Sequence, residues 1–348
     1  MGIKRLNKFI QEKKLTNEYP NLEFYLKHNK KQGKNTVIAI DFWLYAYKFT
    51  YSYGNMLYGF WNQATNFLSH RVIPLYVFDG LPPTEKEVTL LIRQKKKQNI
   101  ESKLKKIKDA IQKDEDNYGL EKEKQRLEKS LIKVTKQDII KVKQLFDVLN
   151  VPYVTAIGEA DALCARLYKD DIITACLSDD MDMLAFGCGK TIKFSEGKII
   201  EYDLARILEE LKFTYFEFID MCILFGCDYI RTCNKLDYMD SYKLITQYRS
   251  IDNIFSNAEH SIVNIDNDKC KILLDNHKNV HKLFTTLCNK EETPDNKNIS
   301  ITKKIEVSKV FNFLIEHCPN IMKYKSNQIK NSICYINHHI ENNLMNTG

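Results

Sequence analysis

The stretch CLSDDMDMLAF, residues 176–186, sets three aspartates within four positions between two apolar runs. Ionised carboxylates are costly to hold this close to a buried core. The run that leads into them, IITACLSDD (172–180), has the length and residue types of a buried β-strand. Alternation along an extended chain places Asp180 and Asp182 on one side and Asp179 on the other. The stretch therefore predicts a strand whose carboxyl end carries two acids on one side and a third on the other.

Short β-branched runs also occur elsewhere in the chain, and segments with helical spacing separate them. Three that end near an acidic residue are TVIAID (36–41), RVIPLYVFD (71–79) and VPYVTAIG (151–158). A further segment, TIKFSEGKIIEY (191–202), predicts a hairpin that turns at Glu196–Gly197. Strands separated by helices are typical of α/β proteins. We therefore predict an α/β fold with a mostly parallel central sheet and helices on both faces.

Residues 84–149 differ from the rest, because they contain no proline and a single glycine, Gly119. Apolar residues recur with a period of about 3.6 on a charged background, which predicts long helices with one apolar stripe. They are Ile100, Leu104, Ile107 and Ile111, followed by Leu127, Leu131 and Val134. We expect a break near Gly119 and another helix over about 135–149. A solvated helical hairpin without a function is an alternative explanation.

The composition allows a sizeable core and gives the chain a mild positive charge. Of 348 residues, 44% are hydrophobic, and the formal net charge is +7. This balance favours an anionic partner, although only weakly. No apolar run approaches the roughly 20 residues of a membrane span, and the N-terminus lacks a signal-peptide pattern. The absence of a C-x-x-C pair and of a G-x-x-x-x-G-K-[ST] loop argues against zinc ribbons and P-loop NTPases.

Seven carboxylates follow apolar segments in a pattern that predicts one shared site. They are Asp41, Asp79, Glu159, Asp161, Asp180, Asp182 and Asp228. The carboxyl ends of parallel strands meet at one edge of a sheet, so we expect these acids to converge. Any one of them is explained equally well as a helix cap or an Asx-turn.

Seven carboxylates on one edge repel one another strongly unless cations neutralise them. Oxygen-only ligands select hard divalent ions, Mg²⁺ or Mn²⁺. The number of acids exceeds the need of one ion, which predicts a two-ion site of the kind used for phosphoryl transfer. A D-x-D pair alone is a weak signal, because it also occurs in glycosyltransferases and aspartyl phosphatases.

Seven short blocks occur in order between Met1 and about Ile245. They are MGIKRLNKFI, VIAIDFWLYAY, PLYVFDGLPP, SLIKVTKQ, GEADALCARL, SDDMDMLAFGCGK and DMCILFGCDY. As a set they resemble the XPG/flap endonuclease family of structure-specific 5′ nucleases. LAFGCGK and MCILFGCDY are similar to the exonuclease branch, whereas VFDGLPP and LIKVTKQ are similar to the flap-cutting branch. The resemblance implies a PIN-like 5′ nuclease fold with a helical arch inserted over about residues 84–134.

The resemblance also implies roles for individual residues. One metal group would contain Asp41, Asp79, Glu159 and Asp161, and the second ion would be bound by Asp180, Asp182 and Asp228. Lys86 and Arg93 match the two basic residues that neutralise the scissile phosphate, and with Asp41 and Asp180 they form the expected catalytic set. A solvated helix face is the alternative explanation of Lys86 and Arg93. The residues expected to contact DNA are Gly2, Tyr47, Lys95, Lys96 and Lys97.

Two aromatic features have competing explanations. Tyr47 occupies the position of a family aromatic that stacks on a base, although an apolar helix could equally bury it in the core. The stretch YSYGNMLYGFW (51–61) stands where the family has an apolar wedge that bends the duplex, and ordinary packing is the alternative.

Two segments depart from the family pattern. The family carries a helix-hairpin-helix of the form GIGPKxA after the GCDY block, whereas TCNKLDYMDSYKLI (232–245) lacks its glycines and proline. Glycine permits close approach of the backbone to phosphate, so the grip on duplex DNA and any potassium site are in doubt. The C-terminal stretch QIKNSICY (328–335) lacks the key residues of a clamp-binding peptide, so no sliding-clamp partner is predicted.

The sequence thus predicts a nuclease that uses two Mg²⁺ ions, with Mn²⁺ as a substitute, and cuts DNA at 5′ flaps, nicks or ends during replication, repair or recombination. We expect a monomer without membrane contact, located in the nucleus, in the host nucleus if the chain is viral, or alternatively in the cytoplasm. An RNA 5′ nuclease and a catalytically inactive nucleic-acid-binding relative are the alternatives. The expected organisation is a nuclease domain over 1–250, made of blocks 1–105 and 135–250 and the arch, and a variable helical region over 251–348.

Overall fold

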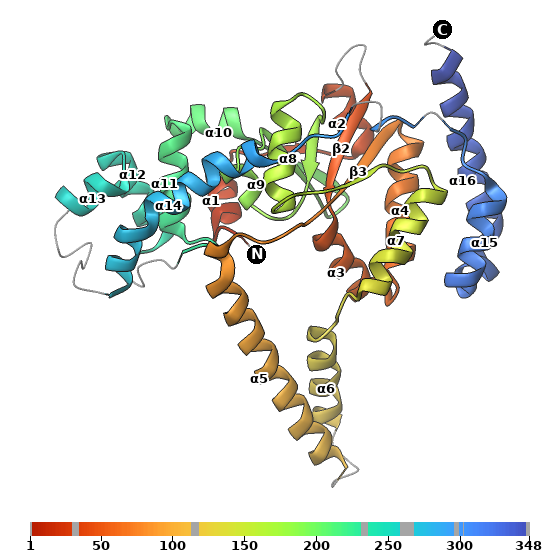
Figure 1. Cartoon of the computed structure of the whole chain (residues 1–348), viewed down its shortest axis with the longest axis horizontal. Coiled ribbons are helices and arrows are strands. Elements are labelled where there is room, and N and C mark those ends of the chain that lie inside the picture. Colours follow the sequence, from red (N-terminus) through yellow and green to blue (C-terminus); the bar gives the residue numbers. More distant parts are fainter. Residues whose placement is uncertain are drawn as a thin grey trace.

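A computed structural model describes residues 2–29, 35–112, 118–230, 236–257, 268–295, 299–301 and 303–345. Its centre is a mixed seven-stranded sheet, in the order β1-β7-β6-β5-β2-β3-β4, with helices on both faces (Figure 1). The strands are β1 (Asn17–Tyr19), β2 (Thr36–Asp41), β3 (Val72–Phe78), β4 (Tyr153–Thr155), β5 (Ala175–Leu177), β6 (Lys190–Ser195) and β7 (Lys198–Asp203). The predicted α/β class is confirmed.

Five adjacent strands, β6, β5, β2, β3 and β4, run parallel, so their carboxyl ends lie along one edge. The hairpin β6–β7 turns at Glu196 and Gly197, which have φ angles of 51° and 80°. Positive φ at both central residues suits the right-handed twist of paired strands. The five predicted strand regions are confirmed, but the edge strand β1 was not predicted. Its three residues, NEY, are too few to show a periodic pattern.

The sheet has a hydrophobic core on each face, because successive strand residues point in opposite directions. In β2, Val37 and Ala39 belong to one core, and Ile38 and Ile40 belong to the other. The helices on the first face are α1 (Leu6–Glu12), α8 (Ala160–Lys169), α9 (Asp182–Ala185), α10 (Leu204–Leu211), α11 (Tyr215–Phe225), α12 (Tyr238–Tyr248), α13 (Ile251–Asn257) and α14 (Asp268–Lys290). Those on the second are α2 (Leu22–Asn29), α3 (Phe42–Tyr53), α4 (Met56–Ser69), α7 (Lys136–Val148), α15 (Val307–His317) and α16 (Pro319–Met345).

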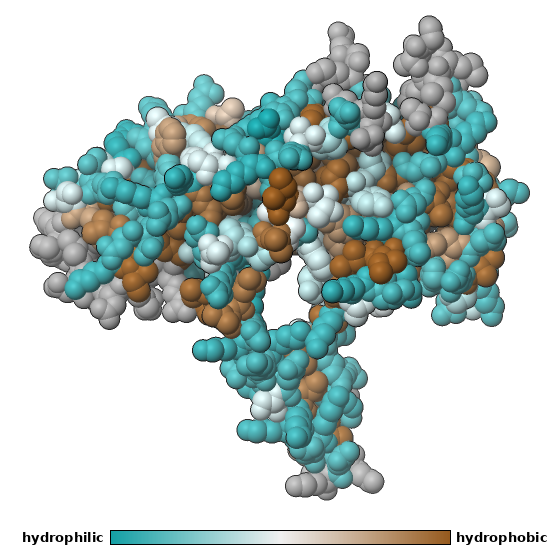
Figure 2. Space-filling model, in the orientation of Figure 1, coloured by the Kyte–Doolittle hydropathy of each residue, from teal (hydrophilic) through white to brown (hydrophobic). Residues whose placement is uncertain are grey.

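Two helices project from this body as an arch, α5 (Glu87–Ile111) and α6 (Tyr118–Ser130) (Figure 1). The two helices pack against each other, and Lys108 pairs with Glu128 at 2.9 Å. The space-filling view shows an opening between the arch and the body (Figure 2). The expected break at Gly119 was placed slightly too late, because Gly119 is already the second residue of α6. A glycine in the first turn disturbs few helical hydrogen bonds.

The part of 251–348 that the structure describes is helical and packs against both cores. Helix α14 contacts α8 and α11, while α16 contacts α4. Among the helices of the described residues, none combines the length and apolar character that a bilayer span requires.

Candidate active site

The carboxyl edge of the parallel strands carries acidic residues held by backbone groups. Asp41 is the last residue of β2, and it also caps α3 by accepting a hydrogen bond from the Leu44 amide at 3.4 Å. Asp79 follows β3, and its Oδ1 accepts the Ala160 amide of α8 at 2.8 Å. The capping explanation is therefore correct for Asp41, but capping uses only part of the hydrogen-bonding capacity of each carboxylate.

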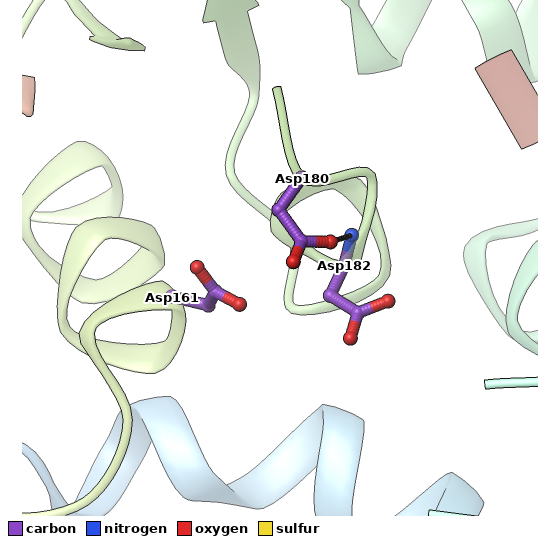
Figure 3. A group of neighbouring side chains, drawn as sticks. All are labelled: Asp161, Asp180 and Asp182. Atoms are coloured by element: carbon purple, nitrogen blue, oxygen red, sulfur yellow. Dashed lines mark hydrogen bonds between the residues drawn. The ribbon is translucent and has the colours of Figure 1, made fainter. Parts of the chain in front are cut away.

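Three acids from two elements face one another closely. Ligand oxygens of Asp161, Asp180 and Asp182 all lie within 4.8 Å of one another (Figure 3). The Asp182 amide donates to Asp180 Oδ1 at 3.1 Å, which fixes the turn between β5 and α9. Among the described residues, nothing donates a hydrogen bond to the buried Oδ1 of Asp182. A buried, unsatisfied carboxylate oxygen beside two other carboxylates is a strong candidate for metal coordination.

Most of the predicted site residues line one open cavity of about 320 Å³. Its lining consists of Asp41, Trp43, Leu44, Tyr47, Asp79, Lys86, Arg93, Glu159, Asp161, Asp180 and Asp228. Asp182 is 2% exposed and lies next to this group, because its amide donates to Asp180 Oδ1. The structure thus brings together all seven acids. Asp179 points away, as the alternation predicted, and pairs with Lys48 at 3.4 Å.

The electrostatics of the cavity disfavour ionisation of its acids. Burial, together with the charges of Asp79 and Asp180, raises the pKa of Asp41 to about 7. Burial and the nearby carboxylates also raise the pKa of Asp161 and Asp182 well above the usual range. The pKa of Asp79 and Asp180 is raised as well, again mainly by burial. A bound divalent cation reverses this effect, because it stabilises the ionised carboxylates.

These residues fit a hard divalent metal. The donor atoms are carboxylate oxygens, without the sulfur or imidazole that softer transition metals prefer. The unsatisfied Asp182 Oδ1 and the mutual approach of Asp161, Asp180 and Asp182 add geometric support.

Lys86 and Arg93 both reach the acids from the start of the arch. Lys86 ends a short 3₁₀ helix, η1 (Thr84–Lys86), and its ammonium group donates to Glu159. Burial alone would lower the pKa of Lys86, but Glu159, then Asp161 and Asp228, raise it. Arg93 lies on α5 and pairs with Asp228. Both cations therefore line the cavity, and the solvated-face explanation does not describe them.

The residues expected to contact DNA lie in different surroundings. Gly2 has a φ of 76°, and a Cβ built there would lie 1.9 Å from Asp180 Oδ1, so only glycine fits against the acids. Tyr47 is 45% exposed beside the cavity, with its ring 6.2 Å from that of Trp43, so the core explanation is wrong. On α5, Lys95 and Lys96 are exposed and Lys97 is half-buried.

The aromatic stretch 51–61 divides into two parts. Tyr51 and Tyr53, at the end of α3, are 61% and 53% exposed. Phe60 and Trp61, on α4, are buried in the core. Packing therefore explains the second part, and a wedge could be formed only by the first.

The altered segment 232–245 is described from residue 236 onwards, and its Thr232–Lys235 portion lies outside the described residues. Asp237 caps α12 by accepting the Tyr238 amide at 2.8 Å, and it pairs with Arg5 at 3.0 Å. This acidic replacement thus ties α12 to the N-terminus, close to α1.

Sequence reasoning missed two hydroxyl groups that bind the acids. The Tyr229 hydroxyl donates to Glu159, and the Ser178 hydroxyl donates to Asp41 at 3.2 Å. The sequence held a signal for both, because Tyr229 follows Asp228 in FGCDY and Ser178 directly follows β5, two residues before Asp180. Hydroxyls next to strand-end acids are natural partners for those carboxylates.

Comparisons with known proteins agree with this geometry. The XPG N-terminal domain matches residues 1–100, and the XPG I-region matches residues 150–228. Flap endonuclease 1-A of Sorghum bicolor is 34% identical over 290 residues, which cover 77% of this chain and 72% of the relative. Flap endonuclease 1 of Enterocytozoon bieneusi is 33% identical over 273 residues, or 73% of this chain and 72% of the relative.

The fold is also shared with a solved structure, the catalytic core of Rad2 in complex with a DNA substrate. It superposes with a TM-score of 0.68 at 19% identity, over 95% of this chain and 100% of that one. The two family regions and the flap endonuclease relatives place the chain in the metal-dependent nuclease class of hydrolases, with which the acidic cavity is compatible. The chain belongs to the XPG/flap endonuclease family of structure-specific 5′ nucleases.

The raised carboxylate pKa values predict that the metal-free protein loses stability as pH rises. Between about pH 4 and pH 7 the native state binds more protons than the unfolded state, so stability falls with rising pH. We expect the Tm without metal to be lower at pH 8 than at pH 5.5 by about 5 °C. Mg²⁺ should reverse most of the loss. Calorimetry or thermal fluorescence measures both effects.

The Asp161→Asn variant should show a weaker pH dependence and a weaker response to Mg²⁺, because it lacks one of the perturbed carboxylates. The exposed Asp179→Asn change serves as the matched control and should behave like the wild-type protein. An identical pH slope in Asp161→Asn and wild type would contradict the assignment.

Proposed function

We propose that this nuclease acts on DNA with single-strand/double-strand junctions and uses two Mg²⁺ ions, which Mn²⁺ can replace. The convergence of seven carboxylates, six that line one cavity and Asp182 next to them, is the observation that carries the proposal. Asp41, Asp79 and Glu159 would hold one ion, and Asp180, Asp182 and Asp228 the other. The sequence grouped Asp161 with Asp41, Asp79 and Glu159, but its ligand oxygen lies within 4.8 Å of those of Asp180 and Asp182, so we now assign it a position between the two groups.

Divalent ions bound there supply Lewis acidity for attack of water on a phosphodiester. The side chains of the protein bind and orient the substrate. Lys86 and Arg93 can bind the scissile phosphate and neutralise its charge, because both already reach carboxylates on the cavity wall. Tyr47, half-exposed at the rim, offers a face on which a nucleobase can stack.

The arch provides the route for a single strand. Lys95 and Lys96 are exposed on α5, one of the two arch helices, and Figure 2 shows an opening between the arch and the body. Lysines on a helix attract phosphates without reading the base sequence, so shape would decide which DNA is cut. The DNA substrate bound to the Rad2 catalytic core supports a nucleic-acid ligand on this fold.

We also propose that the protein is a monomer and that it acts without binding a sliding clamp. The proposal also includes a nuclease domain over 1–250, a C-terminal helical region over 251–348 and a nuclear location, in the host nucleus if the chain is viral. A DNA substrate in replication, repair or recombination favours that compartment.

A substrate panel tests the proposed activity. Purified protein with Mg²⁺ should cut a 5′-flap or nicked DNA duplex and leave a 5′-phosphate, while an RNA analogue should remain largely intact. Asp180→Ala should abolish cleavage and largely preserve DNA binding, since it removes a ligand that faces Asp161 and Asp182. Asp179→Asn, one residue away, should retain most activity. Preferred cutting of RNA, or full cleavage by Asp180→Ala, would refute the proposal.

The two cations give a second prediction. Lys86→Ala and Arg93→Ala should each lower the single-turnover cleavage rate by about 10²–10³-fold, because a charge-stabilising group is lost from the reacting phosphate. DNA affinity should change much less. Lys198→Ala, at the far side of the sheet where Lys198 pairs with Glu18, is the control and should cleave normally. Rates near wild type in both cavity variants would show that these cations have no catalytic role.

A further inference from the structure

A buried carboxylate from the C-terminal region binds the backbone beside the acidic cavity. Glu291 follows α14 directly and is 6% exposed. Its Oε2 accepts the Ile157 amide at 2.8 Å, and its Oε1 accepts the Gly158 amide at 2.9 Å. Two N–H donors compensate for the cost of burying this charge, and they use both oxygens at once.

The same loop is held from its other side by the residues after β3. The Gly80 amide donates to the Gly158 carbonyl at 2.7 Å, and the Leu81 amide donates to the Ile157 carbonyl at 3.1 Å. A Cβ at Gly80 would lie 2.2 Å from the Ala156 carbonyl oxygen, so only glycine allows this approach. Both Ile157 and Gly158 therefore have their backbone N–H and their backbone C=O in hydrogen bonds.

The next residues of the chain are metal-site acids. Glu159 precedes α8, and Asp161 lies in its first turn. Asp79, which precedes Gly80, accepts the Ala160 amide at 2.8 Å. The loop thus joins three carboxylates from two strand ends, and Glu291 is the side chain that anchors it to α14.

We propose that Glu291 is a positioning residue for the metal centre: by clamping the 157–158 backbone it sets the placement of Glu159 and Asp161 and thereby the affinity for divalent cations. The inference rests on the proposed function. Glu291 lies outside both matched family regions, 1–100 and 150–228, so the clamp links the C-terminal region to the metal centre. Loss of a group that orients metal ligands typically weakens metal binding 10–100-fold.

Titration with Mn²⁺ alone, followed by calorimetry, tests the clamp without reference to activity. Glu291→Ala loses both hydrogen bonds, and its Kd for Mn²⁺ should rise at least about 10-fold. Glu291→Gln keeps one acceptor oxygen but turns an NH₂ group toward the other amide, so its effect should be intermediate. In cleavage assays, the Mg²⁺ concentration for half-maximal rate should rise, while excess Mg²⁺ restores most of kcat with little change in KM for DNA.

Glu201→Gln is the matched control. Glu201 is 1% exposed and accepts a hydrogen bond from Asn17 at 2.9 Å, on the opposite part of the sheet. This variant should lose stability but keep the wild-type Kd for Mn²⁺. Folding of every variant is checked by its circular dichroism and Tm.

The outcomes separate the two proposals. If the wild-type protein cuts DNA and the folded Glu291 variants bind Mn²⁺ as tightly as it does, the clamp proposal is wrong and the proposed function stands. An equal loss of Mn²⁺ affinity in Glu201→Gln would also overturn it, since general destabilisation would then explain the effect. Wild-type protein that binds Mn²⁺ but cuts none of the DNA substrates would instead refute the proposed function.

Discussion

Repulsion among carboxylates at one edge of the sheet is the constraint on which the rest of the structure depends. Burial raises the pKa of Asp41, Asp161 and Asp182, so these side chains resist ionisation. The protein offsets part of this cost with its own donors. Lys86, Arg93, Tyr229 and Ser178 each donate to one of the acids. A divalent cation would offset much of the remainder, which makes the cavity a site prepared for charge rather than for apolar ligands.

The parallel order of β5, β2, β3 and β4 explains why this repulsion is concentrated in one place. The chain proceeds from β2 to β3 and β4 on one side, while β5 pairs with β2 on the other. Asp41 and Asp180 therefore lie on the two sides of the point where the strand order reverses. Ligand sites of open α/β sheets form at such a point, so topology and electrostatics define the same location.

Much of the site could be predicted because its acids follow strands with strong apolar patterns. Asp179 could even be separated from Asp180 and Asp182 by alternation alone, and its pair with Lys48 agrees. The three-residue strand β1 could not be predicted, since a pattern needs more residues than NEY provides. Glu291 could not be found either, because its partners are backbone amides more than 130 positions away. Contacts of that kind depend on tertiary packing and leave no local signal.

The arch begins at the cavity itself, which has a consequence for the electrostatics of the site. Lys86 immediately precedes α5, and Arg93 lies two turns along that helix, ahead of Lys95 and Lys96. The cations that meet the acids and the exposed lysines of the arch thus lie on one continuous segment, from Lys86 at the start of α5 to Lys96 within it. A strand that displaces α5 also displaces Lys86 and Arg93 relative to Glu159 and Asp228. In the proposed function, a DNA strand that moves the arch therefore also changes the charge balance of the cavity.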